Sequence, residues 1–164
     1  DLMRSTIDNS DAAIIALKDE MSYLDNYLLL EKLRFEDKFV YKIEVADGID
    51  KEKYFVPAML LQPYVENSIR HGMRFLENRQ GFIGIKAALE KGQLVCSIDD
   101  NGIGREKAAA LKSNMHIEYQ SRGMNISNRR AELYKIELEI IDKKDAHGNA
   151  AGTKIILKMP VDIK

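Results

Sequence analysis

The 164-residue sequence has no tryptophan, one cysteine, three prolines and no excess of either charge. Its 25 basic and 26 acidic residues give a net charge of -1, which excludes the polybasic surface typical of a nucleic-acid-binding protein. The single cysteine, Cys96, lies in an apolar run typical of a buried strand, so it is expected to be neither a metal ligand nor half of a disulfide. We therefore expect a reducing compartment and no contact with nucleic acid.

Long hydrophobic runs are also missing. No apolar run approaches the roughly 20 residues that cross a bilayer, and no segment has the layout of a signal peptide. A chain of this length can bury roughly two-thirds of its unfolded surface in one core without a disulfide or a structural metal. The lone buried cysteine makes us expect a cytoplasmic setting. Because the first residue is Asp1 rather than methionine, we also expect a domain cut from a longer protein.

The spacing of apolar residues predicts two helices and a strand in the first half of the chain. Residues 11–36 carry apolar side chains at helical spacing, which indicates a long amphipathic helix that ends near Asp37. Alternation over residues 39–45 predicts a half-buried strand. A second helix is expected over residues 57–72, because its first proline suits a first helical turn, and Pro63 is expected to kink it.

The second half of the sequence predicts mostly strands. Residues 82–89 and 94–99 are expected to form a hairpin, and residues 137–142 and 153–159 read as two final strands. A further helix is expected over residues 124–134. This order predicts the α/β class, a two-layer sandwich with helices on one face of a mixed sheet.

One side of the second expected helix carries a chemical cluster of Glu66, Asn67, Arg70 and His71. A carboxylate and an amide oxygen can hold Mg²⁺ or its water shell. An arginine and a histidine one turn later can reach phosphate oxygens. Taken alone, however, such a group more often forms an ordinary solvated face.

Three glycine motifs follow. Asp100-Asn101-Gly102-Ile103-Gly104 leaves an apolar strand with a carboxylate that can accept from a donor such as an adenine amino group, in a backbone that can turn tightly beside a flat ligand. Ser121-Arg122-Gly123-Met124 precedes a helix start, where N–H groups and the helix dipole favour phosphate. Gly152-Thr153 opens the last strand. Each motif alone predicts only a turn or the start of a helix.

The joint order of these motifs resembles the Bergerat (GHKL) ATP-binding fold of histidine kinases, DNA gyrase B subunits, Hsp90 chaperones and MutL repair proteins. Two stretches more closely resemble the LytS-type sensor histidine kinases, namely residues 27–35, YLLLEKLRF, and residues 56–72, VPAMLLQPYVENSIRHG. The resemblance covers nearly all of the chain. It implies the ATP-binding catalytic domain of a two-component sensor histidine kinase, a transferase that uses ATP and Mg²⁺.

The resemblance also implies a division of the chain and a set of site residues. Residues 1–36 would hold the tail of an upstream dimerisation region and a long helix, and residues 37–164 would form the catalytic domain. Asn67 would bind Mg²⁺, with Glu66 as a second candidate, and Asn67 and Arg70 are the candidate catalytic residues. The nucleotide would contact Asn67, Arg70, His71, Asp100, Gly102, Ile103, Gly104, Ser121, Arg122, Gly123, Met124 and Thr153.

Two features depart from the family pattern. Ser121 stands where the family usually has a glycine in the motif that closes the lid over the nucleotide, a lid expected at about residues 105–120. No Asn-Pro-His-Phe type acceptor motif surrounds His71, His116 or His147. The acceptor histidine is therefore expected on upstream dimerisation helices of a homodimeric, inner-membrane parent, which would pass the phosphoryl group to a response regulator. Contact with a membrane would occur only through parent segments absent from this chain.

Two alternatives stay open at this point. The first is a hydrolysing ATPase of the same fold, whose relatives carry a water-activating glutamate one helical turn before the asparagine. Pro63 occupies that position here, which counts against hydrolysis. The second is a non-catalytic nucleotide-binding module that acts through protein contacts, for which loss of Asn67 or Asp100 would be the sign. Both residues are present.

Overall fold

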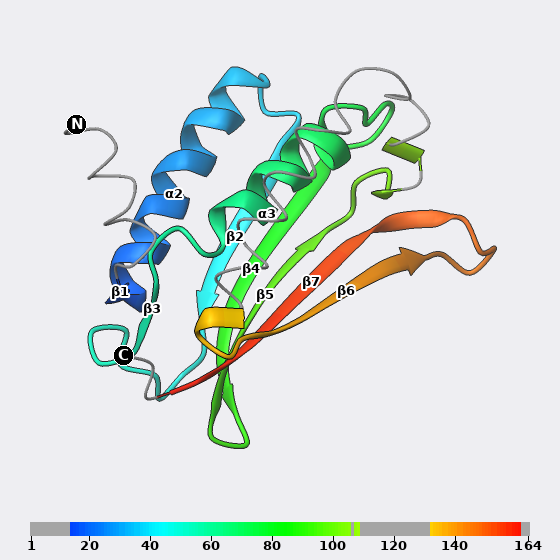
Figure 1. Ribbon diagram of the computed structural model, residues 1–164. Coiled ribbons are helices and arrows are strands. Elements are labelled where there is room, and N and C mark those ends of the chain that lie inside the picture. Colours follow the sequence, from blue (N-terminus) through cyan, green and yellow to red (C-terminus); the bar gives the residue numbers. More distant parts are fainter. Residues whose placement is uncertain (1–13, 106, 109–131, 162–164) are drawn as a thin grey trace, which may run out of the picture.

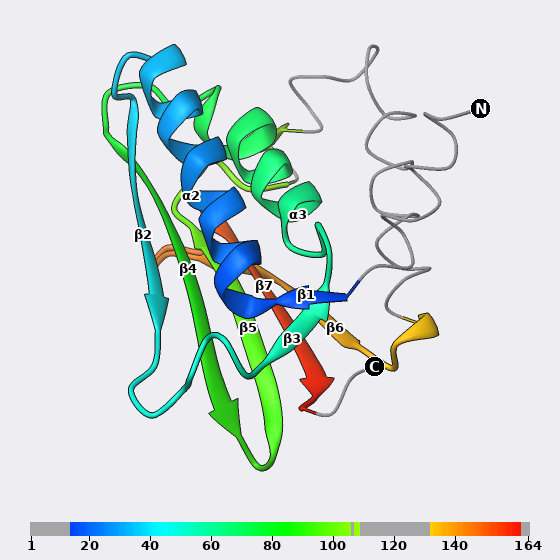
Figure 2. The same ribbon diagram turned by 90° about the vertical axis from the view of Figure 1, so that its left-hand side faces the viewer.

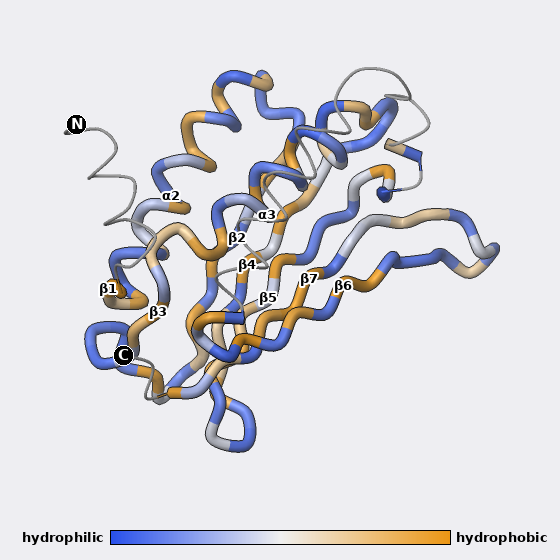
Figure 3. The backbone as a smooth tube through the Cα atoms, viewed as in Figure 1, coloured by the Kyte–Doolittle hydropathy of each residue, from blue (hydrophilic) through white to orange (hydrophobic). Residues whose placement is uncertain are grey.

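The computed structural model describes residues 14–105, 107–108 and 132–161. The described chain has two layers, a sheet and a pair of helices that lie side by side over one face of it (Figures 1 and 2). In Figure 3, polar and apolar segments follow each other along the strands and around both helices, as expected for elements with one buried face. The predicted α/β class is therefore confirmed.

The main sheet has five strands in the order β2-β4-β5-β7-β6. Its outer strand β2 pairs in parallel with β4, whereas the other neighbours are antiparallel, which makes the sheet mixed as predicted. Each of the five predicted strands lies within an observed one. In chain order these are β2 Phe39–Val45, β4 Gly81–Glu90, β5 Gln93–Asp100, β6 Glu137–Lys144 and β7 Ala150–Pro160.

The first helix, α2 (Leu17–Arg34), is shorter at its start than the predicted residues 11–36. The three residues before it form the strand β1 (Ile14–Ala16), which pairs antiparallel with β3 (Phe55–Pro57) in a small second sheet. The helix ends close to the predicted position, because Glu36 and Asp37 adopt positive φ angles of 52° and 60° that no α-helix contains.

The second helix does not begin at Pro57, and this prediction is wrong. Pro57 belongs to β3, where it stands opposite Ile14, and the helix α3 runs over Gln62–Asn67. Pro63 lies in its first turn, where the missing N–H leaves no bond unmade, so it does not kink an interior. The chain then continues as the π-helix η1 (Ser68–Met73). Such turns are rare and frequently occur at functional sites.

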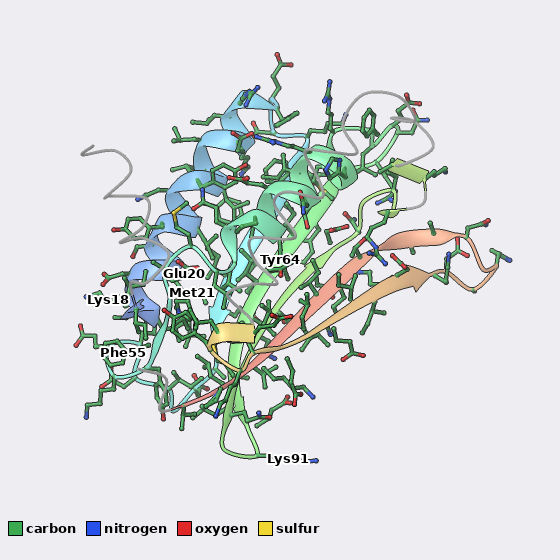
Figure 4. All side chains as sticks on the ribbon, in the orientation of Figure 1. Lys18, Glu20, Met21, Phe55, Tyr64 and Lys91 are labelled. Atoms are coloured by element: carbon green, nitrogen blue, oxygen red, sulfur yellow. The ribbon has the colours of Figure 1, made fainter. Side chains whose placement is uncertain are left out.

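A buried carboxylate of α2 holds the start of α3. Glu20 is 1% exposed, and its two oxygens accept hydrogen bonds from the backbone N–H groups of Met59 at 3.0 Å and Leu61 at 3.1 Å. Figure 4 labels this side chain on α2. The bond from Leu61, the N-cap, satisfies an N–H group at the helix start, and the bond from Met59 fixes the turn before it. The position of α3 is therefore tied to α2.

Both helices and the sheet share one hydrophobic core. The predicted boundary between residues 36 and 37 thus separates two segments with common packing, and it stays a prediction. Cys96 is buried in this core, and burial raises the pKa of its thiol to about 12. None of the described helices is long and apolar enough to cross a membrane. The core includes Leu17, Leu24, Leu28, Phe39, Tyr64, Val65, Ile83, Ile85, Cys96, Ile98, Ile155 and Leu157.

Candidate functional site

The site is built around Asp100, the last residue of β5, which is only 3% exposed. Its Oδ1 accepts hydrogen bonds from the backbone N–H of Gly102 at 2.9 Å and of Thr153 at 3.2 Å. Its Oδ2 accepts from the hydroxyl of Ser68 at 2.8 Å. The donors come from the loop after β5, from β7 and from η1. Three segments far apart in the sequence therefore fix one carboxylate.

Burial and hydrogen bonding act on this carboxylate in opposite directions. Burial raises the pKa of Asp100, while the bonds from Gly102, Ser68 and Thr153 and the charge of Lys143 lower it. Burial is the larger effect, so the pKa lies above its usual value. A carboxylate offers about four acceptor positions, and three are taken by the described residues. One position on Oδ2 is left for a further donor.

Gly72 and Gly102 allow two backbones to touch beside this carboxylate. A Cβ on Gly102 would lie 2.4 Å from the Cα of Gly72. The carbonyl of Gly72 also accepts a bond from the N–H of Ile103 at 3.4 Å. The sequence predicts Gly102 as a residue that shapes a ligand pocket. In the structure, the lack of a side chain at Gly102 allows η1 to pack directly against the loop after β5.

Gly152 joins β7 to the same carboxylate. Its φ is +125°, and a Cβ at this position would lie 2.0 Å from the carbonyl oxygen of Asp100. This close approach places Thr153 opposite Asp100 in the β5–β7 register. The structure therefore brings the predicted residues Asp100, Gly102 and Thr153 together.

The cluster predicted on one helix face is divided by the change from α3 to η1. Asn67 ends α3 and is half-buried, as is Glu66, which accepts a bond from Gln62 Nε2 at 3.4 Å. Arg70 is exposed, whereas His71 is buried at 8% exposure. A π-helix has more residues per turn than an α-helix, so the 100° spacing fails beyond α3. The prediction that these four residues share one helix side is wrong for His71, which is buried where Arg70 is exposed, and the role of His71 toward phosphate stays a prediction.

Charges from both helices meet above the sheet. Burial raises the pKa of Tyr27 on α2, and the carboxylates of Glu31 and Glu66 add to the shift, while Arg70 and Arg34 oppose it. The polar side of α3 therefore lies near α2. Within the described ranges, no group of three His, Cys, Asp or Glu side chains forms a metal cage. Magnesium ions that bind phosphates commonly keep several ligands from water and from the phosphates themselves.

Ser68 was not among the predicted site residues. The available signal was a hydroxyl among core-facing residues, which needs a buried partner. Other predicted residues lie outside the described residues, namely Ser121, Arg122, Gly123, Met124, most of the expected lid and most of the expected helix 124–134. Arg105, at the start of the expected lid, forms two bonds of 2.8 Å to the carboxylate of Asp142 on β6.

Comparison with known proteins points to one family. The model of the family "Histidine kinase" matches residues 1–39. A Staphylococcus epidermidis protein described as an uncharacterized sensor-like histidine kinase is 33% identical over 111 residues, 68% of this chain and 19% of that protein. Sensor protein LytS of Staphylococcus saprophyticus is 29% identical over 167 residues, 96% of this chain and 26% of LytS. The chain thus spans about a quarter or less of the length of these relatives.

Solved structures agree in fold. The catalytic domain of histidine kinase ThkA superposes with a TM-score of 0.61 at 14% identity, over 93% of this chain and 98% of that one. The mycobacterial sensor histidine kinase MprB gives a TM-score of 0.60 at 14% identity, over 93% and 99%. At such identities the likeness concerns the fold, while the curated relatives carry the sequence relationship. The chain therefore belongs to the sensor histidine kinases and has the α/β fold of their catalytic domain.

Proposed function

We propose that this chain binds Mg-ATP and transfers its γ-phosphoryl group to a histidine of the parent kinase. The observation that carries the proposal is the carboxylate of Asp100, buried at the end of a central strand and fixed by three donors. Such a group is costly to bury unless its acceptor positions are used. The position left on Oδ2 suits the amino group of adenine, which is a donor.

The adenine side and the phosphate side of this site would share one helical segment. Ser68 contacts Asp100. Asn67 directly precedes Ser68 in the sequence, and Arg70 follows Ser68 by two positions. We assign Asn67 as the magnesium ligand and Arg70 and His71 as phosphate contacts. When bound, Mg²⁺ would neutralise charge on the phosphate oxygens. These residues would bind and orient the nucleotide.

Pro63, one helical turn before Asn67, favours transfer to histidine over hydrolysis. In-line attack by water needs a positioned base, which typically contributes about 10²- to 10⁴-fold to the rate. Pro63 has no such group, whereas a neutral imidazole is itself a nucleophile and needs none. The acceptor would be a histidine on upstream dimerisation helices, in a homodimeric inner-membrane parent that serves a response regulator.

Replacing Asn67 by alanine is expected to abolish the magnesium-dependent part of ATP binding, because its amide oxygen is the proposed ligand. Glu66→Gln is expected to leave binding largely unchanged, since glutamine keeps an oxygen ligand. The measurement is the rise in melting temperature on adding ATP with and without Mg²⁺. Equal rises for the parent chain and Asn67→Ala would contradict the assignment. Phosphate release above about 1 s⁻¹, lost in Glu66→Gln, would instead favour the hydrolysing ATPase.

Incubated alone with labelled ATP, this chain is expected to acquire no stable phosphohistidine. None of its histidines stands in an acceptor motif, and His71 is buried. Adding the upstream dimerisation helices of the parent should restore labelling of those helices. Acid-labile label mapped to His71, His116 or His147 of the isolated chain would show that the proposed acceptor is wrong.

A further inference from the structure

Ser68 makes a contact with the proposed adenine anchor that sequence analysis did not anticipate. It begins η1, is 6% exposed, and donates its hydroxyl hydrogen to Oδ2 of Asp100 at 2.8 Å. Oδ1 of the same carboxylate is already opposite two backbone N–H groups, of Gly102 and Thr153. Ser68 is therefore the described donor to Oδ2, the oxygen that we propose accepts from the base.

We propose that Ser68 determines which purine the site accepts, by keeping Oδ2 of Asp100 a hydrogen-bond acceptor. In this arrangement the site takes a purine with an amino group at C6 and refuses one with a carbonyl group there. The proposal rests on the proposed function, in which Asp100 meets the base. Ser68 is a positioning residue, because it acts on the base through Asp100.

The reason lies in where a proton could sit on the carboxyl group. A proton on Oδ1 would face two N–H donors, so only Oδ2 can carry it. A protonated Oδ2 becomes a donor, and a donor pairs with a C6 carbonyl and opposes a C6 amino group. Burial already favours the neutral form of Asp100. The Ser68 hydroxyl opposes this, because its hydrogen bond to Oδ2 favours the charged form and lowers the pKa of Asp100.

Removing the hydroxyl is therefore expected to change base preference as well as affinity. In Ser68→Ala, the charged Oδ2 loses its one described donor. The neutral form of Asp100 then becomes more populated, and its hydrogen on Oδ2 opposes the C6 amino group of adenine. If the lost bond to the charged form is worth about 1.4 kcal/mol or more, the affinity for ATP should fall by about tenfold or more. The hypoxanthine nucleotide ITP, which carries a carbonyl at C6, should lose less or gain. The ratio of ATP to ITP affinity is expected to fall by about tenfold or more.

The test is calorimetric titration of the whole chain with Mg-ATP and with Mg-ITP, for the parent sequence, Ser68→Ala and Ser68→Thr. Threonine keeps the hydroxyl, so its ATP to ITP ratio should stay close to that of the parent chain although its methyl group alters packing. Ser68→Cys, of similar size with a weak donor, should fall between the parent chain and Ser68→Ala. Thermal unfolding of each variant shows whether the fold is retained.

The outcomes separate the inference from the function beneath it. If Ser68→Ala binds both nucleotides with the parent ratio, or loses both equally, Ser68 has only a structural role and the inference is overturned. If the parent chain prefers ATP, Ser68→Ala loses that preference and Ser68→Thr retains it, the inference holds. If the parent chain binds neither nucleotide, the proposed function itself fails.

Discussion

Replacing Asp100 by asparagine is expected to weaken Mg-ATP binding by about 2 kcal/mol or more, roughly 30-fold. The amide oxygen can still accept from the N–H groups of Gly102 and Thr153, and the hydroxyl of Ser68 can turn to accept from the new NH₂ group. The local structure therefore has a reason to persist. The adenine amino group, however, would meet a donor in place of an acceptor, and the charge that strengthens the bond would be gone.

A loss of binding without unfolding is the distinguishing feature of this variant. Burial raises the pKa of Asp100, which means that folding disfavours its charged form at neutral pH. Replacing the charged carboxylate by a neutral amide is therefore not expected to lower the free energy of unfolding. Asp99→Asn is the matched control, because Asp99 lies on the other face of β5 and pairs with Lys143. Calorimetric titration giving equal affinities for the parent chain and Asp100→Asn would overturn the role of Asp100.

Gly152→Ala is expected to lower the free energy of unfolding by about 3 kcal/mol or more. The backbone φ of +125° is one that residues with a Cβ rarely adopt, and the added atom would lie 2.0 Å from the carbonyl oxygen of Asp100. That neighbour is backbone within the sheet, so it cannot swing aside as a flexible side chain would. Relief requires β7 to move away from β5, which would also lengthen the bond from Thr153 to Asp100.

Gly148→Ala provides the control for backbone strain alone. Its φ of +81° is also positive, but a Cβ there meets nothing within 4 Å. It is expected to cost about 1–2 kcal/mol. Urea denaturation of both variants gives the comparison, and nucleotide affinity should fall only for Gly152→Ala. Similar unfolding midpoints for the two would mean that the sheet absorbs the clash.

The strands were predictable from the sequence because each has a single buried face. Alternation in residues 82–89 and 94–99 places both strands, and the turn between them has positive φ at Lys91 and Gly92, of 51° and 78°, as a two-residue hairpin requires. The start of the second helix was not predictable in this way. Pro57 suits a first helical turn and an edge strand equally, and the choice is made by pairing with Ile14, far away in the sequence.

The candidate site was predictable in its main acid but not in the contacts that hold it. Asp100 is marked by an apolar strand that ends in glycines. Its bond to Ser68 joins residues 32 positions apart, and it depends on a π-helix that no periodic pattern predicts. The hydrogen bonds to Glu20 come from backbone N–H groups 39 and 41 residues away, and no local sequence pattern predicts them. Long-range contacts, and with them the strands β1 and β3 and the π-helix η1, are what the sequence left open.

The bond from Thr153 to Asp100 also orders events during synthesis. A growing chain releases Ser68, then Asp100 and Gly102, and the last donor, Thr153, emerges 53 residues after Asp100. Until β7 is made, β5 has only β4 beside it and Oδ1 lacks one of its two donors. A ribosome that stalls before this strand therefore leaves a chain in which the proposed anchor for the base is incomplete. Retention on an immobilised adenine nucleotide would select finished chains from interrupted ones.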